Sequence, residues 1–96
     1  MNPADYVVVA DLKNASDREM RIFLEMTCEE IFLDPGHEIQ LLAKPSDGLL
    51  PITIHYVNDG LQVFAAKEWN PDWHIRFMGA VIKPNYPTRL AELQTS

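Results

Sequence analysis

The chain has 96 residues, of which 47% are hydrophobic, and it carries 14 acidic side chains, 8 basic side chains and one cysteine. This length supports one hydrophobic core and therefore one domain, and a lone cysteine excludes both an intramolecular disulfide and a cysteine-based zinc module. The net charge of −6 opposes contact with nucleic acid or with a membrane surface, because both need clustered Lys and Arg.

Turn-forming residues recur at short intervals along the whole chain and predict many short strands. The segments between them are rich in Val, Ile, Phe and Tyr and leave little room for helices of ordinary length. We expect an all-β fold, a small antiparallel β-sandwich or flattened barrel of about seven or eight short strands. This β domain covers residues 1–83, and residues 84–96 form a C-terminal tail.

The first predicted strand covers residues 6–12, where three successive valines favour a strand over a helix because they are β-branched. The next stretch, residues 16–33, fits two templates. Ser16 and Glu19 have the capping-box spacing of a helix start, whereas every second residue from 20 to 28 is apolar, as in a half-buried strand. The strand template matches a larger fraction of its positions, nine of ten against nine of twelve for the helix, so we favour the strand and keep the helix as the alternative.

Cys28 lies on the apolar side of this alternating pattern. We therefore interpret it as an ordinary buried cysteine. The alternative is a catalytic nucleophile, which would need a neighbouring His and a stabilised thiolate.

Residues 50–66 form the most clearly patterned segment, a predicted β-hairpin. With Asp59 and Gly60 as a two-residue type I′ turn, Tyr56 pairs with Val63 and Ile54 with Ala65. One face of the hairpin is then apolar and half-buried, and the other is mixed. The apolar set is Ile52, Ile54, Tyr56, Val63 and Ala65, and the mixed set is Thr53, His55, Val57, Gln62 and Phe64.

Three further segments complete the predicted fold. Residues 39–43, after a type II turn, form a short strand with Ile39, Leu41 and Ala43. Residues 73–77 alternate between apolar and polar side chains, as a half-buried strand does. Gly79 then provides a turn or bulge before a strand over residues 80–82. In the tail, prolines keep residues 84–87 extended, and a short helix follows from Thr88.

Four short motifs occur in a distinctive order. They are Asn14-x-Ser16, Met20-x-Ile22-x-Leu24-Glu25, Leu33-x-Pro35-Gly36 and Asp59-Gly60-x-x-Val63. This order resembles a group of small uncharacterised bacterial all-β proteins over roughly residues 7–82, although Met26 follows Glu25 where that group often has Pro. The resemblance implies a small β-sandwich or barrel-like fold and no known activity.

The acidic side chains are concentrated in the first half of the chain. Residues 1–48 hold ten acidic and four basic side chains, and residues 49–96 hold four of each. We interpret the excess as a solvated surface, with a docking surface for a basic partner or a weak cation site as alternatives. No apolar run approaches the roughly 20 residues that span a bilayer, so we expect a cytoplasmic protein.

No residue pattern predicts catalysis or a cofactor. A metal site would need three or four ligands converging on one point, and His37, His55 and His74 are at least 18 positions apart. We interpret all three as surface residues. The sequence has no Gly-rich phosphate loop and no Ser-centred nucleophile elbow.

The most distinctive local feature is a turn flanked by Trp69 and Trp73. Large aromatic side chains with polar tips are typical of binding hot spots. The candidate contact residues are Val57, Phe64, Trp69, Trp73 and Tyr86. The structural alternative places Trp73 in the core and Trp69 over the open end of the sandwich.

These observations favour a non-catalytic module that associates with itself, as a homodimer, or with another protein. Association would occur through sheet edges or through the outer face of the hairpin, and it would add stability to a chain with a small core. The alternative is a small-ligand carrier or small enzyme with a pocket between the sheets, lined by polar groups such as His74, Arg76 and an acid.

Overall fold

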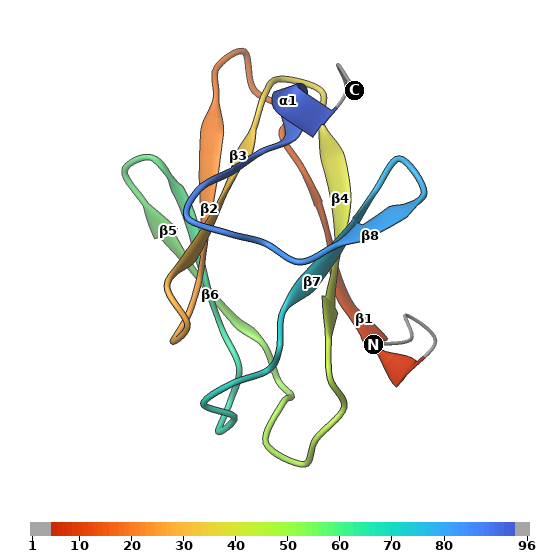
Figure 1. Ribbon diagram of the computed structural model, residues 1–96. Helices are drawn as coiled ribbons and strands as arrows, with labels where there is room; N and C mark the ends of the chain where they lie inside the picture. Colours follow the sequence, from red (N-terminus) through yellow and green to blue (C-terminus); the bar gives the residue numbers. More distant parts are fainter. Residues whose placement is uncertain (1–4, 94–96) are drawn as a thin grey trace.

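The computed structural model describes residues 5–93, which fold into two facing β-sheets (Figure 1). One sheet has the strand order β1-β4-β7-β8 and the other has the order β5-β6-β2-β3-β9. The predicted all-β sandwich is confirmed. The elements are β1 (Val7–Lys13), β2 (Met20–Leu24), β3 (Glu29–Leu33), β4 (Glu38–Ala43), β5 (Thr53–Val57), β6 (Gly60–Phe64), β7 (His74–Phe77), β8 (Ala80–Ile82), β9 (Thr88–Arg89) and α1 (Leu90–Leu93).

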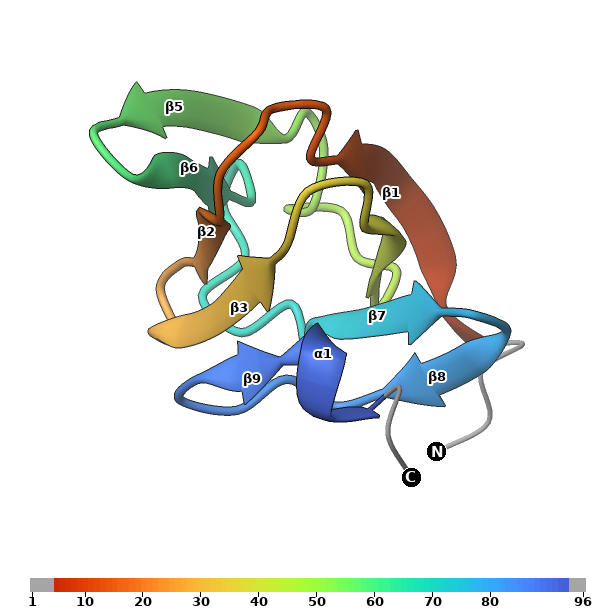
Figure 2. The same ribbon diagram turned by 90° about the horizontal axis from the view of Figure 1, so that it is seen from above.

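Most neighbouring strands are antiparallel, as predicted, but β2–β6 and β3–β9 are parallel pairs. Viewed from above, β5 and β1 lie at one end of the two layers, and β8, β9 and α1 lie at the other (Figure 2). The short helix predicted for the tail is confirmed as α1. Residues 1–4 of the predicted domain and 94–96 of the predicted tail lie outside the described residues.

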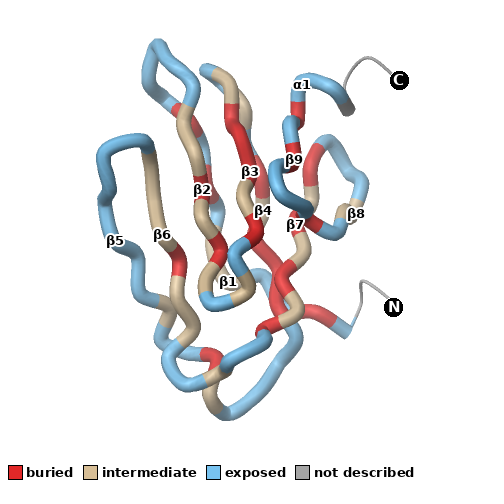
Figure 3. The backbone as a smooth tube through the Cα atoms, turned by 60° about the vertical axis from the view of Figure 1, so that its left-hand side comes forward, coloured by how far each residue is buried: buried red, intermediate tan, exposed pale blue. Residues whose placement is uncertain are grey.

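The hydrophobic core lies between the sheets and draws on both of them. Along β7, Ile75 and Phe77 are buried while His74 and Arg76 face outward, as the alternating pattern predicted. Figure 3 shows the buried positions gathered on the central strands. The large side chains that are buried completely are Trp73, Ile22, Leu24, Ile31, Leu33, Ile39, Leu41, Leu42, Leu49, Ile75, Leu90 and Val63.

Residues 16–33 form strands rather than a helix, but they form two strands instead of one. The chain reverses at residues 25–28, between β2 and β3. Cys28 lies in this turn with a φ of 65° and is exposed, and Met26 is 54% exposed. The prediction of a buried Cys28 is therefore wrong, because the alternation that placed it inside ends with the strand at Leu24.

The predicted hairpin is present, but its register differs by two residues. Val57 pairs with Gly60, so Asn58 and Asp59 are the turn residues instead of Asp59 and Gly60. Gly60 is needed for another reason: a Cβ at this position would lie 1.7 Å from the carbonyl oxygen of Arg21 on the adjacent β2. The shift of two leaves both faces of the hairpin unchanged, because side chains alternate with a period of two.

A single buried amide, Asn14, connects the two sheets. Its Nδ2 donates to the carbonyl oxygens of Arg18 and Leu33, both at 2.8 Å, and its Oδ1 accepts from the N–H and the hydroxyl of Ser16 at 3.0 and 2.6 Å. Its backbone N–H donates to His37 O at 2.9 Å. Because Asn14 follows β1 of one sheet and Leu33 ends β3 of the other, these bonds hold the sheets together.

We expect Asn14→Ala to lower the free energy of unfolding by about 3 kcal/mol, since it removes the side-chain donor of the buried Leu33 carbonyl and the acceptor of the Ser16 N–H and hydroxyl. Chemical denaturation monitored by circular dichroism would measure the change. Asn70→Ala is the matched control. Asn70 is exposed and accepts one bond from Asp72 N–H, so its loss should cost less than about 1 kcal/mol. Equal losses for the two variants would contradict the role of Asn14.

Candidate functional site

The four edge strands of the two sheets differ in how well they are protected. β8 has three residues, and β9 has two and leads directly into α1. β1 is longer, but its register shifts at a bulge between Val8 and Ala10, and it carries Asp11 and Lys13. Short strands, bulges and charged side chains all discourage the pairing of an edge with another chain.

β5 has none of these protections. Its sequence, Thr-Ile-His-Tyr-Val, contains no acidic or basic residue other than His55, no Pro and no Gly, and all five residues are exposed (Figure 3). Tyr56 is 90% exposed and Ile54 is 39% exposed. Among the described residues, β5 is the one edge of at least five residues that lacks both a bulge and a Lys, Arg, Asp or Glu side chain.

The backbone of β5 also has hydrogen-bonding groups available for a further strand. The two-residue loop makes Val57 and Gly60 the closing pair, which in such hairpins exchanges hydrogen bonds. Bonded and non-bonded pairs alternate along an antiparallel ladder. Thr53, His55 and Val57 therefore direct their N–H and C=O groups toward β6, and Ile54 and Tyr56 direct theirs toward solvent.

An apolar hollow of about 220 Å³ adjoins the start of β5. Phe64, which lines it, is the ladder partner of Thr53, and the Phe64 ring lies 4.9 Å from the His55 ring. Trp69, also in the lining, is 75% exposed. The full lining is Met26, Phe64, Ala65, Ala66, Lys67, Glu68 and Trp69. We call strand β5 and this hollow together the β5 surface.

The structure brings together only some of the predicted contact residues. Phe64 and Trp69 share the hollow, and Val57 lies at the other end of β5. Trp73 is buried completely and donates from Nε1 to Glu25 O at 3.0 Å, so it belongs to the core. Tyr86 is 66% exposed, and its hydroxyl donates to Thr27 O at 3.4 Å. Tyr86 precedes β9, which is the edge of the five-stranded sheet opposite β5.

The exposure of Tyr56 and Ile54 does not follow from the sequence pattern. Alternation places both residues on the half-buried face of the hairpin, which is the face they occupy. However, β5 is the outermost strand of its sheet, and the core stops at Val63 of the neighbouring β6. Alternation identifies the face of a strand, but only the strand order shows whether anything covers that face.

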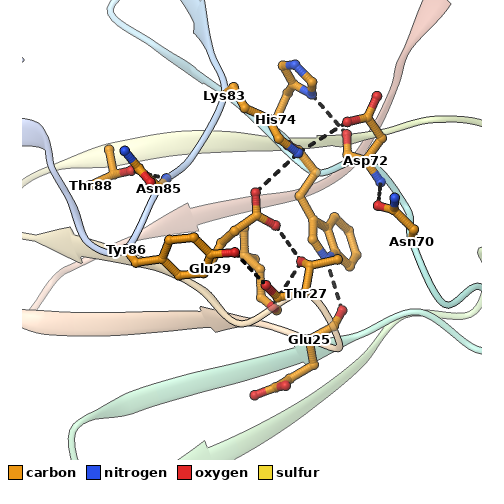
Figure 4. Close-up of polar contacts among 12 residues, drawn as sticks. Glu25, Thr27, Glu29, Asn70, Asp72, His74, Lys83, Asn85, Tyr86 and Thr88 are labelled. Atoms are coloured by element: carbon orange, nitrogen blue, oxygen red, sulfur yellow. Dashed lines mark hydrogen bonds and ion pairs between the residues drawn. The ribbon is translucent and has the colours of Figure 1, made fainter.

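A cluster of charged side chains near the start of β3 is the other candidate site (Figure 4). Lys83 Nζ lies 3.2 Å from Glu29 Oε2, 3.2 Å from Asp72 Oδ1 and 3.2 Å from Trp73 O. The Glu29 side chain is only 5% exposed. Its other oxygen accepts a hydrogen bond from the Thr27 hydroxyl. These residues join the strand β3 of one sheet to the segments that flank β7 and β8 of the other.

The bonding pattern of this cluster is that of a structural link. An ammonium group has three N–H donors, and Lys83 has an acceptor for each of them. Burial raises the pKa of Tyr6 to about 12, and its hydrogen bond to Asp72 acts in the same direction. The same bond, with help from Lys83, holds the pKa of Asp72 below its usual value. Both shifts move the pKa values of these groups further from neutral pH, whereas acid–base catalysis needs groups that titrate near neutral pH.

The carboxylates of the acidic half are spread over different environments. Glu29 is buried against Lys83, Glu25 accepts a bond from Gln62 at 3.4 Å, and Glu38 lines a hollow on the opposite sheet with Arg76. A docking surface for a basic partner would need these groups on one face.

The three histidines lie apart, each beside an aromatic ring: His37 at 5.3 Å from Phe77, His55 beside Phe64, and His74 at 4.6 Å from Tyr6. Within residues 5–93, no group of three or more His, Cys, Asp or Glu side chains is placed to hold a metal ion. Over the same range, no helix has the length and apolar character needed to cross a membrane.

Comparison with known proteins gives no relative for this chain. No protein family, no curated protein and no solved structure matches it. The resemblance to small bacterial all-β proteins stays a prediction. The geometry of the described residues is therefore the basis for any functional proposal.

The Tyr6–Asp72 bond predicts how stability depends on pH. Asp72, whose pKa is lowered by folding, stabilises the fold at neutral pH and loses this effect below about pH 3.8. Tyr6, whose pKa is raised, stabilises the fold below pH 10 and loses this effect as pH rises toward about 12. We expect Tyr6→Phe to reduce the alkaline loss of stability between these values, measured by the thermal unfolding midpoint across pH.

Tyr86→Phe is the control for this experiment, because its hydroxyl bonds to a backbone carbonyl near the surface. That variant should keep the alkaline slope of the original chain. If Tyr6→Phe also kept that slope, the proposed link between Tyr6 and Asp72 would be wrong.

Proposed function

We propose that this protein is a non-catalytic binding module that adds a strand of another protein chain to β5. The observation that carries the proposal is the contrast between the edge strands. β1 has a bulge and charged side chains, β8 and β9 are short, and β9 leads into α1, whereas β5 has none of these features. Natural proteins usually protect a long, uncharged edge. An edge left open on a chain whose other edges are protected is best explained by a partner strand.

The β5 surface provides the two kinds of contact that strand addition needs, main-chain hydrogen bonds and side-chain contacts. Main-chain hydrogen bonds from the free groups of Ile54 and Tyr56 would give affinity, and pockets for side chains would give specificity. Burial of Tyr56 and Ile54 would add apolar area, since both are now exposed. The apolar hollow beside Phe64 and Trp69 adjoins the Thr53 end of β5, so a partner segment that continues past this end would be the one to place an apolar side chain in it.

The alternative function, a ligand pocket between the sheets, has less support. Core side chains such as Ile31, Leu41 and Trp73 occupy that space. Arg76 does share a hollow with two acids, Asp11 and Glu38, but this hollow is on the outer face of the four-stranded sheet and His74 is not part of it. No observation favours this function over strand addition.

Site-specific photocrosslinking would test the proposal. A photoreactive benzoyl-phenylalanine in place of Tyr56 should give discrete protein adducts in a native lysate, because position 56 would lie within the new pair of strands. The same group in place of Tyr86, which is also exposed but lies away from β5, is the control and should give few or none.

The substitution Ile54→Lys in the photoreactive chain checks that the adducts depend on strand pairing. A lysine on an edge strand opposes pairing, and Ile54 is exposed enough that the fold should tolerate it, as circular dichroism would show. Adducts that form equally at positions 56 and 86, or that survive Ile54→Lys in a folded chain, would contradict strand addition at β5.

A further inference from the structure

The sequence of β5 is complementary to itself when two copies run antiparallel. On this basis we infer that the added strand is β5 of a second copy of the chain, related by a two-fold axis through the His55 pair. The inference rests on the proposed function and names its partner. It gives a continuous sheet in which the two β5 strands are the central pair.

Geometry limits the ways in which two β5 strands can pair. A two-fold axis perpendicular to the sheet keeps the outer face of each copy on the same side, so residues of one face pair with residues of that face. The axis must then pass through a residue paired with its own copy. Centring it on His55 pairs all five residues of β5, whereas centring it on Ile54 or Tyr56 leaves residues of the strand unpaired.

The side chains match in this register. Tyr56 lies opposite the partner's Ile54, and the symmetry repeats this pair, so two aromatic–β-branched contacts form on the inner face. Thr53 lies opposite the partner's Val57 on the outer face, again twice. Aromatic–β-branched pairs such as Tyr56 with Ile54 are among the stabilising cross-strand pairs. On the inner face, the paired strands therefore place no charged side chain next to an apolar one.

Charge favours β5 over other surfaces for contact between copies. Each chain carries a net charge of −6, so two copies repel over most of their surfaces. β5 brings no carboxylate into the contact. The nearest acidic residue along the strand, Asp59 at the hairpin tip, falls opposite the partner's Pro51 when the His55 register is continued.

A cysteine placed on the axis would test both the partner and the register. In a Cys28→Ser background, which removes the native thiol, His55→Cys should form a cross-linked dimer under mild oxidation. Position 55 would be a non-hydrogen-bonded pair with Cα atoms about 4.5 Å apart, within the range for a disulfide. Thr53→Cys is the matched control: its two copies would lie about 13 Å apart along the strands and should not cross-link.

A charge exchange would test the register without new covalent bonds. Ile54→Lys and Tyr56→Glu should each weaken dimerisation in sedimentation velocity, by about tenfold or more in dissociation constant. The double variant should recover much of the loss, because each lysine would then face the partner's glutamate. No recovery, with both single variants folded, would overturn the register.

The outcomes separate this inference from the proposed function. A chain that stays monomeric at high concentration, with no cross-link through His55→Cys, would overturn the inference. Strand addition at β5 would still stand if the photoreactive group at position 56 captured a different protein in an Ile54-dependent way. Cross-linking through Thr53→Cys as readily as through His55→Cys would also overturn the inference, since it would mean collision rather than the paired register.

Discussion

Both sheets depend on one buried side chain, the amide of Asn14. Its two N–H groups and its oxygen are fully used within the described residues, and its backbone carbonyl accepts from Gly36 N–H at 2.8 Å. These bonds fix the end of β1 against the turn between β3 and β4, where the chain passes from one sheet to the other. The position of β3 sets that of β2, and β6 pairs in parallel with β2. The position of the β5 edge therefore depends, through β3, β2 and β6, on the hydrogen bonds of Asn14.

The Lys83 cluster does at one side of the molecule what Asn14 does at another. A carboxylate as buried as Glu29 is tolerated only when it is paired and hydrogen-bonded, and Lys83 and Thr27 provide both conditions. The tail that follows Lys83 adds β9 to β3 and buries Leu90 in the core. This end of the five-stranded sheet is thereby closed, and within residues 5–93 no comparable element covers β5 at its other end (Figure 2). The asymmetry between the two ends is the structural basis for the proposed function.

The local features of this fold follow from the sequence, whereas the features that depend on strand order do not. Alternation located β7 and the hairpin, because a half-buried strand repeats every two residues, and β-branched residues located β1. Alternation failed at Cys28, where a turn interrupted a pattern that continued in the sequence. The hairpin turn was misplaced because Gly60 was taken as a turn residue, although its small size serves the contact with Arg21 of β2. Similarly, Tyr56 was assigned to the correct face, but no local pattern shows that this face extends beyond the opposite sheet.

An open, uncharged edge strand is normally a risk of aggregation, and the arrangement of this chain limits that risk. Pairing between two β5 strands is isologous, so it uses both open edges and leaves none behind. The outer ends of the joined sheet would be the two β9 strands, each two residues long and followed by α1. Pro51 and the hairpin turn bound the pairing segment to about five residues, which is the usual length of a strand. In the inferred dimer, growth would therefore stop at two copies, and the net charge of −6 on each chain would oppose contact through the remaining surface.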